Sequence, residues 1–166
     1  MKIYTKDGHL NIPEEAPIHY TAPAIAQDPR HLVRQVFCQN GHQLITDSNA
    51  MFDGYPGIEL YCETDTRFDL VTLSPYLGDE KRLFDVDFEH HELLRICCPS
   101  CMNELLTLGP HTCQEGAEFV ALYLNPDGDI THSVGICNAW NCHSAFLHAY
   151  GEIIARIRHD SVLPRC

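Results

Sequence analysis

The sequence predicts an α+β fold that is rich in β-structure, with antiparallel hairpins followed by a C-terminal helix. Two observations predict the hairpins: short runs of β-forming apolar residues recur, and turn sequences such as Asp53-Gly54 and Asn125-Pro-Asp-Gly128 separate them. A third predicts the helix, because apolar residues recur at helical spacing near the C-terminus. With 166 residues, 45% of them apolar, the chain can bury one core, so a single domain is expected.

Residues 1–29 are predicted to form an extended arm that lies on the surface of this domain. The segment has little hydrophobic period, and prolines interrupt it at Pro13, Pro17, Pro23 and Pro29. A short hairpin at Lys6-Asp-Gly8 would also fit its first residues. The single domain is therefore assigned to residues 30–166.

Three strand-like regions are predicted within the domain. His31–Phe37 alternates in the manner of a strand, and Ile58–Thr64 with Phe68–Leu73 has the pattern of an antiparallel pair. Phe119–Leu124 and Ile130–Ile136 are apolar and flank a strong turn sequence, which predicts a hairpin.

The C-terminal region is predicted to be a helix from about Ser144 to Arg158. Its apolar stripe would consist of Phe146, Leu147, Tyr150, Ile153, Ile154 and Ile157. Gly151 is unfavourable inside a helix, so a strand pair that turns at Tyr150-Gly151 is the alternative.

Charge and cysteine content restrict the class of protein. The net charge of −12, from 23 acidic and 11 basic side chains, is unfavourable for a module that must neutralise phosphates, so nucleic acid is not the expected partner. No stretch approaches the roughly 18 apolar residues of a membrane span, and the first residues lack the apolar region of a signal peptide. We therefore expect a cytoplasmic protein without a membrane partner, in which metal binding explains the high count of nine cysteines better than disulfides do.

Three close pairs of potential metal ligands follow apolar runs. They are Cys38-Gln-Asn-Gly-His42, Cys98-Pro-Ser-Cys101 and Cys137-Asn-Ala-Trp-Asn-Cys142. Pairs of this kind let one tight turn direct two ligands at a tetrahedral ion, with backbone N–H groups near the thiolate sulfurs. Cysteine and histidine at this spacing predict zinc. Cys98 and Cys101 have the commonest spacing, although a redox pair or two buried thiols would share it.

From about Ile96 to His143 the sequence resembles a zinc ribbon or related zinc-knuckle fold, in which two knuckles share one ion. The resemblance implies that Cys98 and Cys101 share zinc with Cys137 and Cys142. The gap between the last two is wider than a ribbon knuckle usually has, so His143 is an alternative to Cys142.

Cys38 and His42 would form half of a second site. Cys62, Cys113 and His111 are the first candidates to complete it, and His90 and His91 come after them. In a different arrangement, Cys38 and His42 share an ion with Cys98 and Cys101. A short similarity between residues 37–44 and 97–105 also suggests an internal repeat. One Zn²⁺ is expected, and a second would be accommodated.

The expected function is a zinc-binding protein whose metal is structural and whose role is to bind a partner, most naturally a protein. A metal-dependent hydrolase is the first alternative, because residues 85–92 contain Asp85, Asp87, Glu89, His90, His91 and Glu92. That cluster lacks a His-Glu-x-x-His motif, and a solvated acidic segment explains it equally. A nucleic-acid-binding zinc ribbon is the second alternative. No catalytic residue is assigned.

Overall fold

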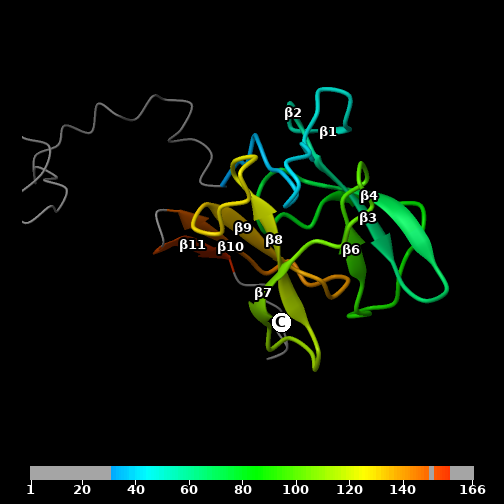
Figure 1. Ribbon diagram of the computed structural model, residues 1–166. Coiled ribbons are helices and arrows are strands. Elements are labelled where there is room, and N and C mark those ends of the chain that lie inside the picture. Colours follow the sequence, from blue (N-terminus) through cyan, green and yellow to red (C-terminus); the bar gives the residue numbers. More distant parts are fainter. Residues whose placement is uncertain (1–30, 150–151, 158–166) are drawn as a thin grey trace, which may run out of the picture. The chain divides into compact units, whose positions relative to one another are not determined.

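The computed structural model describes residues 31–149 and 152–157, and Figure 1 shows the arrangement of their strands. The described residues form β-strands and loops without a helix. The strands are β1 Met51–Phe52, β2 Tyr55–Pro56, β3 Ile58–Glu63, β4 Phe68–Leu73, β5 Arg82–Leu83, β6 Arg95–Cys97, β7 Thr107–Pro110, β8 Glu118–Tyr123, β9 Ser133–Cys137, β10 Ala145–Ala149 and β11 Glu152–Ile157. The β-rich, antiparallel character predicted from the sequence is thus confirmed.

A four-stranded antiparallel sheet has the order β5-β4-β3-β6. β3 and β4 pair from Ile58 opposite Leu73 to Glu63 opposite Phe68, which confirms the predicted pair. Buried and half-buried residues alternate along β3, so one face of the sheet turns toward the core. β1 and β2 form a separate two-stranded ribbon that precedes β3.

A five-stranded antiparallel sheet has the order β11-β10-β9-β8-β7. β8 and β9 are the predicted hairpin around residues 125–128, paired from Phe119 opposite Cys137 to Tyr123 opposite Ser133. Both sheets contribute to one core, in which Leu60 and Val71 of the first sheet cluster with Leu122 and Val134 of the second. This common core fixes the position of the loops that join the sheets.

The predicted C-terminal helix is wrong, because its residues form β10 and β11, which pair antiparallel beside β9. Phe146 lies directly opposite Gly135, and a Cβ built on Gly135 would come within 2.3 Å of the Phe146 ring. Gly135 thus leaves room for an aromatic ring across the strands, and this long-range contact outweighs the local helical spacing. Ile153, Ile154 and Ile157 are β-branched, which also favours a strand.

His31–Phe37 is not a regular strand. It makes isolated bridges instead, from Leu32 to Tyr76 and from Phe37 to Gln43 and Tyr123. The predicted arm over residues 1–29 lies outside the described residues. Where the structure describes the chain, it contains no helix that is long and apolar enough to span a membrane.

Candidate metal centres

Two groups of potential metal ligands come together in the described part of the chain, each with three cysteines and one histidine. Centre 1 contains Cys38, His42, Cys98 and Cys101, and centre 2 contains His111, Cys113, Cys137 and Cys142. Within each centre, the candidate ligand atoms all lie within 4.8 Å of one another. Such convergence of four soft ligands is the arrangement that a tetrahedral metal ion requires.

The separations within the centres can be compared with zinc geometry. With Zn–S near 2.3 Å and Zn–N near 2.0–2.1 Å, a tetrahedral site places two sulfurs about 3.8 Å apart and a sulfur and nitrogen about 3.5 Å apart. In centre 1, Cys38 Sγ lies 3.4 Å from His42 Nδ1. In centre 2, Cys113 Sγ lies 3.6 Å from Cys137 Sγ, and Cys142 Sγ lies 3.7 Å from His111 Nε2. These distances fit one zinc ion in each centre.

Two turns of similar construction form centre 1. In the first, the backbone N–H of Cys38 donates to His42 O, and the N–H of Gly41 donates to Cys38 O. In the second, the N–H of Cys98 donates to Asn103 O, and the N–H of Met102 donates to Cys98 O.

The flanking backbone follows the same plan in both turns. The bridge from Phe37 to Gln43 corresponds to that from Cys97 to Glu104. Each turn includes a left-handed residue, Gly41 with φ 83° and Met102 with φ 59°. The short similarity noted in the sequence is therefore a structural repeat of two ligand-bearing turns.

Hydrogen bonds to sulfur in centre 1 favour thiolate. The backbone N–H of Ser100 donates to Cys98 Sγ at 3.4 Å, and the Asn40 side-chain amide donates to Cys101 Sγ at 3.5 Å. The Asn40 contact is the main cause that lowers the pKa of Cys101 to about 6, whereas burial raises that of Cys98 to about 11. Cys101 therefore loses its proton first, and Cys98 needs a metal ion to do so near neutral pH.

Centre 2 lies between the loop after β7 and the end of β9. His111 is held by its backbone N–H, which donates to Ala117 O, and Cys137 is the last residue of β9. The N–H of Ala139 donates to Cys137 Sγ at 3.4 Å, as expected of a metal-binding turn. A side-chain hydrogen bond with Cys142 and burial both raise the pKa of Cys137. Without a cation, the Cys137 thiol would therefore stay protonated.

The wide gap between Cys137 and Cys142 is filled by a buried tryptophan. Trp140 is 3% exposed, and its Nε1–H donates to Asp87 Oδ1 at 3.1 Å. The guanidinium of Arg82 lies 3.7 Å from the centroid of the Trp140 ring and donates to Asn141 Oδ1. The extra residues thus anchor the turn to the segment between β4 and β6.

The predicted sharing of ligand pairs differs from the grouping in the structure. Cys98 and Cys101 lie with Cys38 and His42, the arrangement considered as the alternative, and not with Cys137 and Cys142. The resemblance to a zinc ribbon covers only about Ile96 to His143. It therefore leaves out the turn at Cys38–His42, which completes centre 1. Cys142, rather than His143, belongs to centre 2.

Cys62 belongs to neither centre. It is 4% exposed on the core face of β3, and burial raises the pKa of its thiol to about 12. Cys62 is therefore a small apolar core residue. Cys97, the neighbour of Cys98, is also buried and outside both centres, as its position on a strand predicts.

The acidic segment 85–92 does not assemble a third metal centre within the described residues. Two of its carboxylates have other partners: Asp87 accepts a hydrogen bond from Trp140, and Glu92 forms an ion pair with Arg67 at 2.6 Å. The rings of His90 and His91 stack on each other at 3.9 Å. These contacts favour a structural role for the segment over a hydrolase site.

The two centres differ in the state of their cysteines. Cys38, Cys98 and Cys101 are all free thiols, whereas Cys113 is disulfide-bonded. Only thiolate binds zinc well, so an oxidised Cys113 and a metal ion are alternative states of centre 2. Reducing conditions are therefore required for centre 2 to bind metal with its full set of ligands.

Comparison with known proteins does not identify a family. No protein-family model, no curated protein and no solved structure matches the chain. The function must therefore be inferred from the residues and geometry of the two centres.

Proposed function

We propose that this chain is a zinc-binding protein in which both centres hold structural Zn²⁺. The observation that carries the proposal is the convergence of two separate Cys₃His sets at separations that fit tetrahedral zinc. Thiolate and imidazole together are ligands that zinc prefers over magnesium or calcium, which take oxygen. The local likeness to zinc knuckles supports the same metal.

Ligand number and burial favour a structural role over a catalytic one. A catalytic zinc keeps a coordination position for water or substrate, whereas four protein ligands close the site. Cys38 and Cys98 are 0% exposed in centre 1, and Cys137 and Cys142 are 8% and 7% exposed in centre 2. These buried cysteines would limit the access of substrates to the metal, more fully in centre 2 than in centre 1, where His42 is exposed and Cys101 half-buried.

Each centre would link segments that are distant in sequence. Centre 1 joins the turn at Cys38–His42 to the turn at Cys98–Cys101, and centre 2 joins the loop at His111–Cys113 to the turn at Cys137–Cys142. A structural zinc contributes an apparent ~10–16 kcal/mol at neutral pH, while a typical domain has a net stability of only about 5–15 kcal/mol. Zinc would therefore decide whether the domain is folded.

Removal of metal tests this function. Reduced protein should contain two zinc ions per chain by elemental analysis, and a strong chelator should abolish the near-UV circular dichroism of the core. Restoring zinc should restore the signal. A chain that loses all its zinc but keeps its full tertiary signal would argue against structural metal and would favour an open, catalytic site.

We further propose that the domain acts by binding a protein partner through the outer face of the four-stranded sheet. Tyr61, Phe68, Leu70 and Leu83 lie on this face by their strand register, and the last three are 66%, 49% and 54% exposed, in that order. Exposed apolar side chains gathered on one face are typical of interaction surfaces. Glu59 and Glu63 lie beside them, so a partner with an apolar centre and basic rim would be complementary.

Paired variants test this interaction. A partner identified by crosslinking and then purified should bind the double variant Phe68→Ser, Leu70→Ser at least about tenfold more weakly, since hot-spot apolar contacts contribute over 1 kcal/mol each. Met51→Ser is the control, because Met51 is equally exposed at 58% but lies on β1. Equal loss in both variants would contradict the assigned face.

We also propose a cytoplasmic location for the protein, because zinc thiolate centres are most stable in a reducing compartment.

A further inference from the structure

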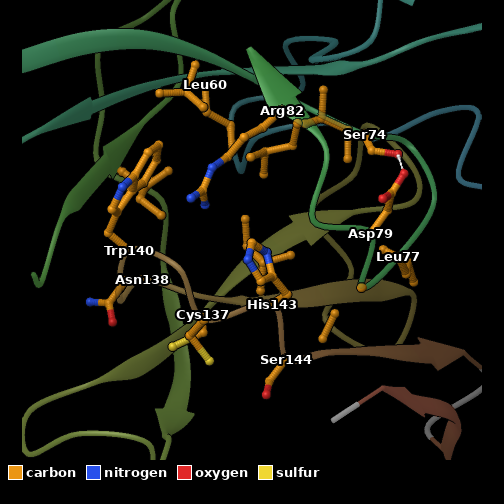
Figure 2. A pocket seen from close by; sticks show the side chains of 18 of the residues that line it. Leu60, Ser74, Leu77, Asp79, Arg82, Cys137, Asn138, Trp140, His143 and Ser144 are labelled. Carbon is orange, nitrogen blue, oxygen red and sulfur yellow. Dashed lines mark hydrogen bonds between the residues drawn. The ribbon is translucent and has the colours of Figure 1, made fainter. Parts of the chain in front are cut away.

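A cavity of about 80 Å³ opens beside centre 2, between the two sheets (Figure 2). Leu60 and Val71 of the four-stranded sheet line one side, and Ile136 and Ala145 of the five-stranded sheet line the other. Since roughly 10–15 Å³ is enough for a cavity to hold one water molecule, this cavity is large enough for several. That space suits a small organic molecule or one end of a larger one.

Arg82 places a positive charge in this cavity. Figure 2 shows its guanidinium directed into the cavity, with Trp140 to one side and His143 below it. The guanidinium stacks on the Trp140 ring and donates to Asn141 Oδ1. Within the described residues, no carboxylate forms an ion pair with Arg82. The stacking fixes the direction of the guanidinium, and the one hydrogen bond that it donates to Asn141 leaves most of its five N–H donors for another acceptor.

The nearby carboxylates are directed to other groups. Asp79, which also lines the cavity, accepts from Ser74 Oγ at 2.8 Å and from the backbone N–H of Lys81 at 3.1 Å. Asp87 accepts from Trp140 Nε1, and its charge and that of Glu80 act on Arg82 without forming an ion pair with it. A half-buried cation surrounded largely by apolar walls, without a direct counter-ion, is costly unless an anion joins it.

We propose that this cavity binds a small organic carboxylate. The carboxylate would accept a pair of hydrogen bonds from Arg82, because the planar guanidinium matches carboxylate geometry. A short apolar chain or ring would extend between the side chains of Leu60 and Ile136. The site goes beyond the structural zinc function and does not depend on the protein partner, although the turn of centre 2 forms one of its walls.

Titration of the reduced, zinc-loaded chain with three aromatic probes of similar size tests the charge of the ligand. Benzoate carries the anion, benzamide is neutral, and benzylamine carries a positive charge. Benzoate should bind with a Kd on the order of 1 mM, as expected for a ligand of this size, and benzamide at least about tenfold more weakly. Two-dimensional NMR should show saturable shifts at the Trp140 indole N–H. Equal binding of all three probes, or preference for benzylamine, would overturn the proposal.

Two arginine variants test the residue assignment. Arg82→Met keeps an apolar stem and should weaken benzoate binding about tenfold or more, while leaving benzamide unchanged. Arg95→Met is the matched control, because Arg95 is exposed and ion-paired with Glu63 on β3. Zinc content, measured for each variant, separates loss of the site from loss of centre 2. If Arg82→Met perturbs folding, the comparison of benzoate with benzamide on the unaltered chain still decides the proposal. Unchanged benzoate affinity in a folded, zinc-loaded Arg82→Met variant would refute it.

Discussion

Replacing Cys98 by alanine should destabilise the protein far more than the same replacement at its neighbour Cys97. Both side chains are buried, at 0% and 3% exposure, so the loss of a small apolar group is similar and amounts to about 1 kcal/mol in each case. Only Cys98 belongs to centre 1. The difference between the variants therefore isolates the contribution of the metal ligand.

The magnitude follows from the zinc contribution. A structural zinc contributes an apparent ~10–16 kcal/mol, so a variant that loses the ion from centre 1 loses a contribution as large as the whole net stability of a typical domain, about 5–15 kcal/mol. Cys98→Ala should therefore be largely unfolded at temperatures at which Cys97→Ala is still folded.

Urea unfolding and elemental analysis of reduced protein would measure both effects. Cys98→Ala should lose one zinc ion, Cys97→Ala should keep both, and the stability gap should close once a chelator has removed zinc from both proteins. If Cys98→Ala kept two zinc ions and unfolded within about 1 kcal/mol of Cys97→Ala, the assignment of centre 1 would be refuted.

Three other outcomes are expected. Gly135→Ala should cost about 1–3 kcal/mol in urea unfolding, because its Cβ would meet the Phe146 ring at 2.3 Å, and a neutral result would contradict the β9–β10 register. Burial raises the pKa of Cys62 from 9.0 to about 12, so only the folded state keeps this proton between those values. Stability should therefore fall above pH 9 by up to about 1.4 kcal/mol per pH unit, less steeply in Cys62→Ala, and identical slopes would exclude Cys62 as the cause. Oxidation should lower the zinc content from two ions toward one, since Cys113 contributes to centre 2 only as a thiolate. Equal zinc content in oxidised and reduced protein would contradict the assignment of Cys113 as a ligand.

Local sequence patterns predicted the hairpins because their determinants are local. The alternation in β3 and β4 and the turn sequence between β8 and β9 each specify strand pairs that are close in the chain. The C-terminal strand pair was only the alternative to the predicted helix, because what favours the strands is not local. The space that Gly135 leaves for Phe146 depends on a partner eleven residues away, which helical spacing alone does not reveal.

The residues of the centres were more predictable than their grouping. All residues of the two centres, His111 included, were among the candidates, whereas Cys62 is a core residue and His90, His91 and His143 belong to neither centre. Spacing identifies a turn that can offer two ligands, but it does not say which distant turn completes the site. The repeat between residues 37–44 and 97–105 was the signal that could have chosen the correct partner, because turns of the same construction face each other in centre 1.

The coordination of zinc in the intact, reduced chain tests the central claim most directly. X-ray absorption at the zinc edge should find two zinc ions per chain with an average shell of three sulfurs near 2.3 Å and one nitrogen near 2.0–2.1 Å, because both centres are Cys₃His. A site with four sulfurs would instead indicate that Cys98 and Cys101 share zinc with Cys137 and Cys142. A shell rich in oxygen would contradict closed structural centres altogether.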